Sequence, residues 1–485
     1  MPQHLIWFRN DLRTHDHEPL VRAASKGAAV AGVYCFNPDD YQQTSLGFAR
    51  TGSLRAKFVI ESVIALRQSL QQLGSDLMVF IGKPEEVIPA LCLKLGVQSV
   101  YYHKEAASEE IHAEQQLEAQ LLKHKILLEG YWGNTLYHPE DLPFPVKRLP
   151  DLFTDFRKKT ERETTVRKTF STPQQLTAIP NLPSTGIPSL SDLGLHAIQP
   201  DERAVLAFKG GEQWALNRLQ EYIWEKDLLK IYKETRNGML GADYSSKFSP
   251  WLALGCISPR KIYEEVKRYE SERVKNDSTY WLLFELMWRD YFRFVVMKYG
   301  NKVFKPEGIQ GIPVQWKMDV DLFEKWRLGK TGYPLVDASM REMLLTGFMS
   351  NRGRQNVASF LTKNLGIYWL WGAAWFESQL IDHDVCSNYG NWNYTAGVGN
   401  DARGFRYFNI PKQAYDYDNK GNYARYWLPE LKNLPGFKAH EPYALKPHEE
   451  DRYDFILTRD YWRPLVDLDR SAKENEKIYK MALGK

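Results

Sequence analysis

The chain contains a polar segment at residues 382–394, which includes Trp392. Two further tryptophans, Trp316 and Trp369, precede this segment. Indole rings oxidise readily, so a row of them could carry an electron between solvent and a buried redox cofactor. The polar segment combines a pair of aspartates with amides and aromatic rings, which suits a flat ring system with polar edges. The alternative interpretation is that these aromatic side chains simply fill the core, as large rings usually do.

A serine-rich segment could bind phosphate. Residues 245–249 read Ser-Ser-Lys-Phe-Ser, and Pro250 follows them. Proline suits the first position of a helix, and Ser249 suits the N-cap position before it. Exposed N–H groups, hydroxyls and a lysine at a helix start are suited to an anion. A plain helix start is the alternative interpretation.

Two arginines at the start of another predicted helix, Arg352 and Arg354, could bind phosphate or carboxylate groups in a bidentate way. We expect Arg354 to neutralise Asp382 or Asp384 if the fold brings them together. The two aspartates could then accept hydrogen bonds from ring N–H or ribose hydroxyl groups. Metal ligation together with His383 is the competing interpretation, but hard metal ions usually need more ligands than these residues supply.

A carboxylate and an indole share one face of the aromatic helix predicted over residues 280–298. Glu285 and Trp288 lie three residues apart, which places both on the same side of a helix. The carboxylate could act as a general acid or base or accept a hydrogen bond from a ligand. It could also simply pair with Arg289 or Arg293.

The composition is that of an ordinary globular chain with an excess of aromatic residues. Its 485 residues, 43% hydrophobic and 26% charged, allow two or three domains with sizeable cores. A formal net charge of +4 permits a nucleic-acid partner without demanding one. The 4 cysteines form no Cys-x-x-Cys pair, so the sequence supports neither a disulfide framework nor a zinc knuckle.

The sequence contains no segment that would direct the chain to a membrane. No apolar run approaches the length of a membrane span. A strand-like run begins at residue 4, which leaves no room for a signal or transit peptide. The few cysteines suit a reducing compartment. We therefore expect a soluble, cytoplasmic protein.

The first 133 residues alternate between strand-like and helix-like patterns. The apolar runs are residues 5–8, 30–36, 77–81, 99–102 and 126–128, and the helical patterns include 53–73 and 108–124. This alternation predicts a parallel sheet covered on both faces. Residues 10–13 (NDLR) follow the first strand in place of a Gly-x-Gly-x-x-Gly fingerprint, so we do not expect a dinucleotide to bind here in the Rossmann manner.

Two further regions follow this α/β domain. Residues 134–205 are rich in proline and predict a long, partly irregular connector, with the basic run 157–159 on a solvated face. Residues 206–485 predict an all-α domain. Its helical patterns are residues 212–233, 259–269, 280–298, 334–345 and 352–365. Asp337 and Arg341 have the spacing of an ion pair within one helix.

Several motifs occur in the order and spacing of the photolyase/cryptochrome flavoproteins, which this chain resembles from residue 4 to about 430. They are residues 8–13 (FRNDLR), 331–334 (TGYP), 351–354 (NRGR) and the polar segment 382–394. A second set resembles the DASH cryptochromes in particular. Its members are residues 390–394 (GNWNY), 397–401 (GVGND) and 407–414 (YFNIPKQA). The resemblance implies an α/β antenna domain, a long linker, and a helical domain that holds FAD folded into a U.

The resemblance also implies roles for individual residues. The flavin-binding set is Tyr232, Ser245, Ser246, Lys247, Phe248, Ser249, Glu285, Asn351, Arg354, Asp382, Asp384 and Asn388. Asn388 would face N5 of the flavin, where an amide accommodates the fully reduced ring. The relay for photoreduction would run through Trp392, Trp369 and Trp316, with Trp392 nearest the flavin. Glu105 matches the glutamate that holds methenyltetrahydrofolate, the usual antenna.

The pocket for a DNA lesion would use Glu285, Trp288, Asn351, Gln355 and Tyr394, with Arg352 beside it on the DNA surface. In the family's repair reaction, an electron from the excited, reduced flavin splits a cyclobutane pyrimidine dimer and then returns. Here Gln355 stands in place of an expected methionine and Tyr394 in place of an expected tryptophan. Each stacking contact is worth roughly 1–3 kcal/mol, so the loss of ring area disfavours flipping a lesion out of duplex DNA.

Two functions follow from this resemblance. We favour a blue-light-absorbing FAD protein that binds DNA and repairs dimers weakly in single strands. The alternative is a blue-light photoreceptor or transcriptional regulator without meaningful photolyase activity.

Overall fold

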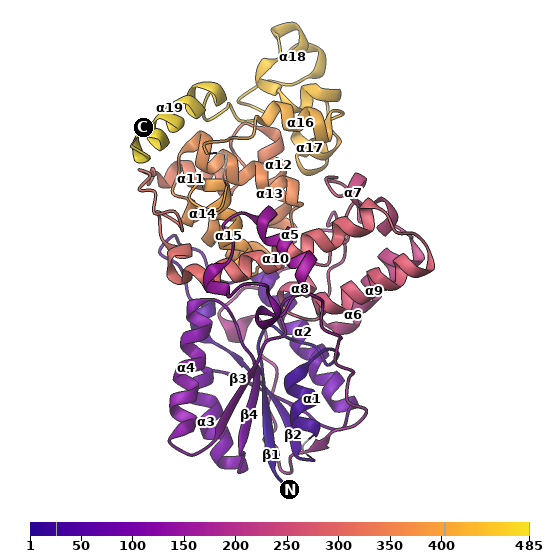
Figure 1. Cartoon of the computed structure of the whole chain (residues 1–485). Coiled ribbons are helices and arrows are strands. Elements are labelled where there is room, and N and C mark those ends of the chain that lie inside the picture. Colours follow the sequence, from indigo (N-terminus) through magenta and orange to yellow (C-terminus); the bar gives the residue numbers. More distant parts are fainter. Residues whose placement is uncertain (26, 402–403, 485) are drawn as a thin grey trace.

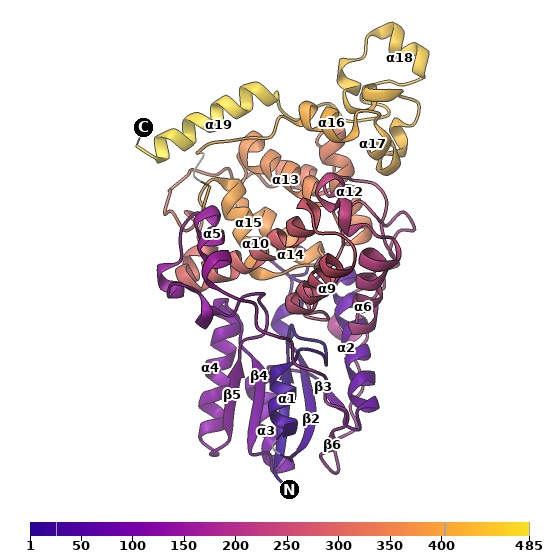
Figure 2. The same cartoon turned by 45° about the vertical axis from the view of Figure 1, so that its right-hand side comes forward.

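The computed structural model describes residues 1–25, 27–401 and 404–484. It consists of an α/β domain that contains the N-terminus and a larger helical domain beside it (Figures 1 and 2). No helix in the described part of the chain is both long and apolar enough to cross a membrane.

A parallel sheet forms the centre of the first domain, with strand order β3-β2-β1-β4-β5. The strands are β1 (Gln3–Phe8), β2 (Ala29–Phe36), β3 (Leu77–Ile81), β4 (Ser99–His103) and β5 (Leu127–Tyr131). The register of β1 with β2 runs from Gln3 opposite Ala29 to Phe8 opposite Tyr34. The strand order reverses at β1, so the residues after β1 emerge at the switch point of the sheet.

Both faces of the sheet are covered by helices, as the sequence predicts. These helices are α1 (Glu18–Ser25), α2 (Ser53–Gln72), α3 (Pro84–Leu95) and α4 (Ser108–Leu122). Leu5 and Trp7 of β1 pack in the core that includes residues of α3 and α4. Ile6 and Phe8 point the other way, into the core shared with α1 and α2. The alternation follows from the two-residue period of a strand.

The remaining helices belong to the connector and the helical domain. They are α5 (Phe153–Glu163), α6 (Glu212–Gln220), α7 (Tyr232–Thr235), α8 (Ser249–Ala253), α9 (Pro259–Glu272), α10 (Asp277–Tyr299), α11 (Val320–Arg327), α12 (Pro334–Thr346), α13 (Asn351–Ser359), α14 (Trp369–Gln379), α15 (Val385–Ala396), α16 (Ile410–Asp418), α17 (Asn422–Trp427), α18 (Pro447–Tyr453) and α19 (Leu468–Ala482). The long α10 passes through the middle of this domain (Figure 1).

Two predicted helices are interrupted, and the connector is more ordered than the sequence predicts. The pattern at 212–233 breaks after α6 into a π-helical turn at Glu221–Glu225, and Asp227 then takes a left-handed φ of 55°. The pattern at 352–365 ends in a second π-helical turn, Phe360–Leu365. The connector supplies α5 and a short strand, β6 (Thr177–Ala178), which pairs in parallel with β2.

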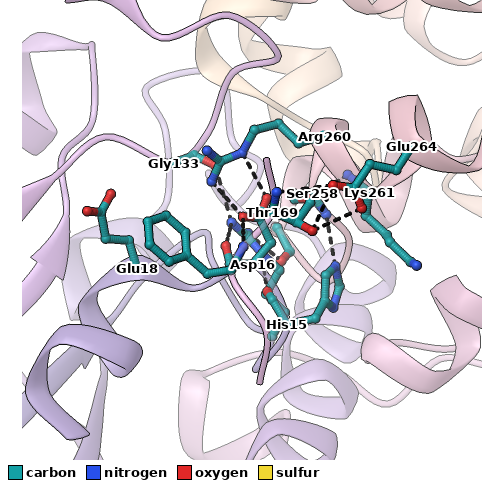
Figure 3. Close-up of polar contacts among 12 residues, drawn as sticks. His15, Asp16, Glu18, Gly133, Thr169, Ser258, Arg260, Lys261 and Glu264 are labelled. Carbon is teal, nitrogen blue, oxygen red and sulfur yellow. Dashed lines mark hydrogen bonds and ion pairs between the residues drawn. The ribbon is translucent and has the colours of Figure 1, made fainter. Parts of the chain in front are cut away.

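A buried polar junction joins the two domains (Figure 3). Asp16 accepts hydrogen bonds from the guanidinium of Arg260 at 2.6 and 3.0 Å, and from the backbone N–H of Phe170 at 3.1 Å. The backbone N–H of Ser258 lies 3.3 Å from His15 Nε2. Because burying an unpaired charge is costly, the ion pair between Asp16 and Arg260 strongly favours one arrangement of α9 against the first domain.

Residues 10–13 after β1 also contact the helical domain directly. The N–H of Leu12 donates to Leu254 at 3.0 Å, and Arg13 Nη1 donates to the carbonyl of Gly255 at 2.9 Å. Gly255 has a φ of +62°, and a Cβ there would lie 2.1 Å from the carbonyl oxygen of Asn10. Only glycine allows the two chains to approach this closely. Residues 10–13 follow β1, where a dinucleotide-binding protein would have its glycine-rich fingerprint. In this chain they instead form a contact between the two domains.

Candidate functional site

A cavity of about 490 Å³ lies in the helical domain between α7, α8, α10, α13 and α15. Many of the predicted site residues line it together, although they come from segments far apart in the sequence. They are Tyr232, Ser245, Ser246, Lys247, Phe248, Ser249, Glu285, Trp288, Asn351, Arg354, Gln355, Asp382 and Tyr394. The structure thus brings together the proposed phosphate segment, the carboxylate and the aromatic side chains in one continuous space.

Asp382 is the buried carboxylate of this cavity. Its Oδ2 accepts hydrogen bonds from Arg354 Nη2 at 2.8 Å and from the Ser249 hydroxyl at 2.6 Å. The expected pairing with Arg354 is confirmed. The second oxygen, Oδ1, is buried without a hydrogen-bond partner among the described residues. An unpartnered buried acceptor is costly, and a ring N–H bound in the cavity would satisfy it.

The start of α8 differs from the sequence prediction. The structure places Phe248 at the N-cap position and Ser249 as the first helical residue. No side chain caps this helix, because the Ser249 hydroxyl is engaged by Asp382 instead. The prediction that Ser249 caps the helix was therefore wrong, although its place on the cavity wall stands.

Lys247 is held in an unusual conformation beside the serines. Its backbone has a φ of 60°, and its side chain is buried. The ammonium nitrogen lies 3.1 Å from the centre of the Tyr244 ring and 3.2 Å from the Ser245 hydroxyl. Burial and the nearby Arg218 charge lower the pKa of Lys247 to about 6. No carboxylate is bonded to this lysine among the residues described, so an anion in the cavity would be its charge partner.

Glu285 pairs with Arg236, which the sequence analysis did not single out. Neither Arg289 nor Arg293 is its partner: Arg289 donates to the carbonyl of Leu252 at 3.0 Å, and Arg293 pairs with Asp384. Burial raises the pKa of Glu285 despite the arginine charge. Arg236 also lines the cavity. Arg236 directly follows α7, and the fold brings it to Glu285 of α10. The two residues are far apart in the sequence, so no short-range spacing predicts this pair.

Asp384 and Asn388 lie at the start of α15, and neither of them lines the cavity. Asp384 forms the N-cap of α15, accepts from the Ser387 N–H at 2.8 Å and pairs with Arg293. Burial raises its pKa, but Arg293 and Arg289 together hold that pKa well below its usual range. The amide of Asn388 donates to the carbonyl of Ala373 at 3.0 Å. Ser387 and Asn391 of the same helix, which the sequence analysis missed, do line the cavity.

Of the three relay tryptophans, only the one assigned farthest from the flavin, Trp316, reaches the surface. Trp392 and Trp369 are buried, and Trp316 is half-exposed. The Trp392 ring packs on α14, where a Cβ at Gly372 would lie 2.3 Å from it. Trp369 begins α14, and its indole N–H donates to the carbonyl of Pro306 at 3.0 Å. Burial alone is also what core packing would produce, so the relay stays a prediction.

The remaining predicted residues surround the cavity or lie apart from it. Arg352 lies outside the lining, where its Nη2 donates to Asn237 at 3.0 Å and its guanidinium lies 4.3 Å from the Tyr417 ring centre. Glu105 belongs to the domain junction, where it accepts from the amides of Asn10 at 3.4 Å and Asn134 at 3.2 Å. Burial raises the pKa of Glu105 to about 7.

One group of residues in the described ranges has ligand atoms close enough to hold a metal: Asp11, His17 and His103. The Leu20 N–H donates to His17 Nδ1 at 3.1 Å, so the proton of that imidazole is on Nε2, which donates to Asp11 at 2.8 Å. His103 Nδ1 lies 2.8 Å from the same oxygen. The three form a hydrogen-bonded cluster, and the competing metal set around His383 does not come together.

Two family profiles match the chain, one for each domain. Residues 4–178 match the family described as DNA photolyase, and residues 281–481 match the FAD binding domain of DNA photolyase. The second range contains Asp382, Arg354 and Trp288, so the cavity lies largely within the FAD-binding domain.

Curated relatives and solved structures agree with these matches. The chain is 58% identical over 478 residues to a protein of Gloeobacter violaceus named Cryptochrome DASH, covering 99% of this chain and 96% of that protein. It is 57% identical to a Synechocystis sp. protein of the same name, covering 99% of both. The crystal structure of a Synechocystis sp. cryptochrome matches with a TM-score of 0.96 at 57% identity over 99% of each chain. A class III photolyase from Agrobacterium tumefaciens matches at 0.89 with 28% identity, over 100% of this chain and 98% of that one.

These similarities cover both domains, the connector and the cavity between the helices. The chain therefore belongs to the photolyase/cryptochrome family, among the cryptochromes DASH, and contains that family's FAD-binding domain.

Proposed function

We propose that this protein absorbs blue light through FAD held in the cavity, binds single-stranded DNA at the mouth of the cavity, and repairs cyclobutane pyrimidine dimers there weakly. The observation that carries this proposal is the shared cavity. Most residues assigned to the flavin, though not Asp384 or Asn388, and the aromatic residues assigned to a DNA base line one continuous space. A ligand bound at one end would thus lie against a base at the other.

The side chains of the cavity fit the parts of FAD. Asp382 offers an unpartnered oxygen to a ring N–H, with Arg354 holding the other oxygen. Lys247 and the serines beside it offer a cation and hydroxyls to the pyrophosphate. Bound there, FAD would supply the absorption of blue light and the transferable electron. The protein's own residues orient the ring, neutralise the phosphates and hold water away from the buried side.

The lowered pKa of Lys247 predicts that the affinity for FAD depends on pH. Without a ligand anion in the cavity, burial and the Arg218 charge lower the pKa of Lys247 to about 6, so the amine is mostly neutral above neutral pH. A pyrophosphate beside it would favour the ammonium form and raise that pKa. Binding would then take up a proton, and FAD affinity should fall by up to about ten-fold for each pH unit above about 6. Titration of the flavin-free protein with FAD at about pH 6.5 and about pH 8.5 measures this.

The control for this prediction is Lys247→Gln, which cannot titrate and should bind FAD with little pH dependence. Glu342 needs its own control, because burial raises the pKa of Glu342 to about 8 and its charge acts on Lys247. A pH dependence that persists in Lys247→Gln and disappears in Glu342→Gln would assign the proton to the glutamate. Equal wild-type affinity at both pH values would contradict the prediction outright.

The aromatic residues that line the cavity support weak binding of a single strand. Trp288 and Tyr394 meet edge-on, with ring centres 6.3 Å apart at 82°. A phenol ring at position 394 offers a base less area for stacking than an indole would. Gln355 adds a buried amide oxygen without a partner among the residues described. This polar pocket suits a base that is already unpaired, because little stacking energy is available to extract one from a duplex.

Two further assignments belong to the proposal. Glu105, partly buried and hydrogen-bonded to Asn10 and Asn134, would hold methenyltetrahydrofolate as an antenna. Trp392, Trp369 and Trp316 would reduce the oxidised flavin in light. All 4 cysteines are free, which suits a reducing compartment such as the cytoplasm.

Illumination of dimer-containing oligonucleotides tests the proposed activity. The protein, with its flavin reduced, is exposed to blue light with the same dimer placed in a single strand and in a duplex. We expect slow repair in the single strand and little or none in the duplex. Trp288→Ala should abolish the single-strand repair while leaving the flavin spectrum unchanged. Absence of repair in both substrates would reject the lyase activity and leave the light-sensor alternative.

A further inference from the structure

The indole of Trp288 is stacked face to face on a second ring that does not belong to the cavity. Phe153 lies against it with ring centres 3.7 Å apart and an angle of 12° between the planes. Trp288 itself lines the cavity, whereas Phe153 does not and is 6% exposed. One broad face of the indole is therefore covered from behind by Phe153.

Phe153 is the first residue of α5, a helix of the connector. Figures 1 and 2 both show α5 beside the long helix α10, which carries Trp288. The Phe153 ring also meets Phe284 and Tyr291 of α10 edge-on, at 5.1 and 5.6 Å between ring centres. A single connector residue thus contacts aromatic rings on three turns of α10.

Polar contacts secure the rest of α5 on the same helix. Arg157 Nη1 lies 2.5 Å from the Tyr280 hydroxyl, which donates to Glu161 at 2.7 Å. The Arg157 guanidinium lies 5.7 Å from the centre of the Phe284 ring. The expectation that the whole basic run at 157–159 lies on a solvated face was therefore wrong for its first residue. These contacts prevent α5 from sliding along α10 and so hold Phe153 in place.

We infer that Phe153 is a positioning residue, which holds the Trp288 indole with its free side toward the cavity so that a pyrimidine can stack there. The inference rests on the proposed function, since it concerns the same DNA-binding pocket. An indole on a helix surface can change rotamer, and ordering it when the base arrives costs binding free energy. The Phe153 ring, stacked on the face of Trp288 away from the cavity, would order the indole when the protein folds. DNA binding would then not have to supply this ordering free energy.

The alternative is that the stack contributes to packing alone. In that case Phe153 would affect the stability of the helical domain but not its affinity for DNA. Phe156 provides the matched comparison, because it lies one turn away on α5 and is 0% exposed. Its ring meets Phe144 edge-on and Phe153 and Tyr291 at a tilt, and it does not stack on Trp288. A substitution there removes core packing from the same helix.

The test compares single-strand binding by the flavin-loaded variants Phe153→Leu, Phe153→Tyr and Phe156→Leu. The probe is a short oligothymidylate with one cyclobutane dimer, and the melting temperature and flavin spectrum are recorded for each variant. Phe153→Leu should raise the dissociation constant about five-fold, a fraction of one stacking contact. Phe153→Tyr keeps an aromatic ring in the stack and should bind the probe with wild-type affinity. Phe156→Leu should lower the melting temperature but keep the affinity.

Each other outcome overturns the inference. Unchanged affinity in Phe153→Leu, or an equal loss in Phe156→Leu, would mean that the stack only packs. If Trp288→Ala weakens binding while Phe153→Leu does not, the inference fails and the proposed function stands. If the wild type does not bind the probe, or Trp288→Ala has no effect, both fail. Should Phe153→Leu not fold, Phe153→Met, which keeps more volume, takes its place.

Discussion

Replacing Trp392 by phenylalanine is expected to slow light-driven reduction of the oxidised flavin by more than about ten-fold. Benzene rings oxidise far less readily than indoles, so the first hop of the relay would face a barrier raised by more than about 1.4 kcal/mol. Trp392 is 2% exposed and packs beside α14, which leaves no room for solvent to take its place. Absorbance of the oxidised flavin, followed under blue light with an external reductant, measures the rate.

The same substitution at Trp375 provides the control. Trp375 is 3% exposed, lies on α14 in the same core as Trp392, and stands outside the proposed relay. Trp375→Phe removes a similar volume from that core, so it should cost similar stability while leaving photoreduction near the wild-type rate. Equal rates in the wild type and Trp392→Phe would show that the electron enters by another route.

Asp382→Asn is expected to weaken FAD binding by roughly 30-fold, which corresponds to about 2 kcal/mol for one unsatisfied buried polar group. The amide keeps the shape of the carboxylate, and its oxygen would continue to accept from Arg354 and Ser249. Its NH₂ group would then replace Oδ1 and place a donor opposite the donor of the flavin ring. The flavin-to-protein absorbance ratio after purification, followed by titration with FAD, measures the loss.

Asp337→Asn is the matched control for this prediction. Asp337 is also a fully buried aspartate, but it accepts from Thr331 at 2.7 Å and Gly332 at 3.0 Å, and it does not line the cavity. Its amide variant should lose stability and retain full flavin affinity. Purification of Asp382→Asn with wild-type flavin content would refute the assignment of its second oxygen to the ring.

Short-range patterns predicted the architecture well. The apolar run at residues 77–81 has the bounds of β3, and the runs at 5–8 and 30–36 begin two residues and one residue after the starts of β1 and β2. These strands are buried on both faces, so their apolar residues are continuous and easily recognised. Both helices were predicted, but their interruptions were missed, because a π-helical turn keeps the local propensities of a helix.

Charge pairing was predicted less well, as Asp337 and Arg341 show. Their spacing predicted an ion pair within α12, but Asp337 accepts from the Thr331 loop and the Tyr461 hydroxyl. Arg341 pairs with Glu430, at 2.8 Å, from a segment much later in the chain. Both side chains bind partners from other segments of the chain, and Asp337 is fully buried at its contacts.

The aspartates at 382 and 384 present the same problem inside the site. They have one residue between them, and their side chains are chemically identical, so the sequence treats them as a pair. In the structure, Asp382 joins Arg354 in the cavity wall, while Asp384 caps α15 and joins Arg293. The turn that begins α15 sends their side chains in different directions.

The sequence by itself determined the order of the domains, the parallel sheet, the family and many of the polar residues that line the cavity. Periodicity and short motifs carry this information because each depends on neighbours in the chain. Only the tertiary structure decided which cation each carboxylate meets, and that a connector ring lies behind Trp288. Hydrogen bonds, ion pairs and stacking act over a few ångströms of space, and the chain brings distant segments within that range only when it folds.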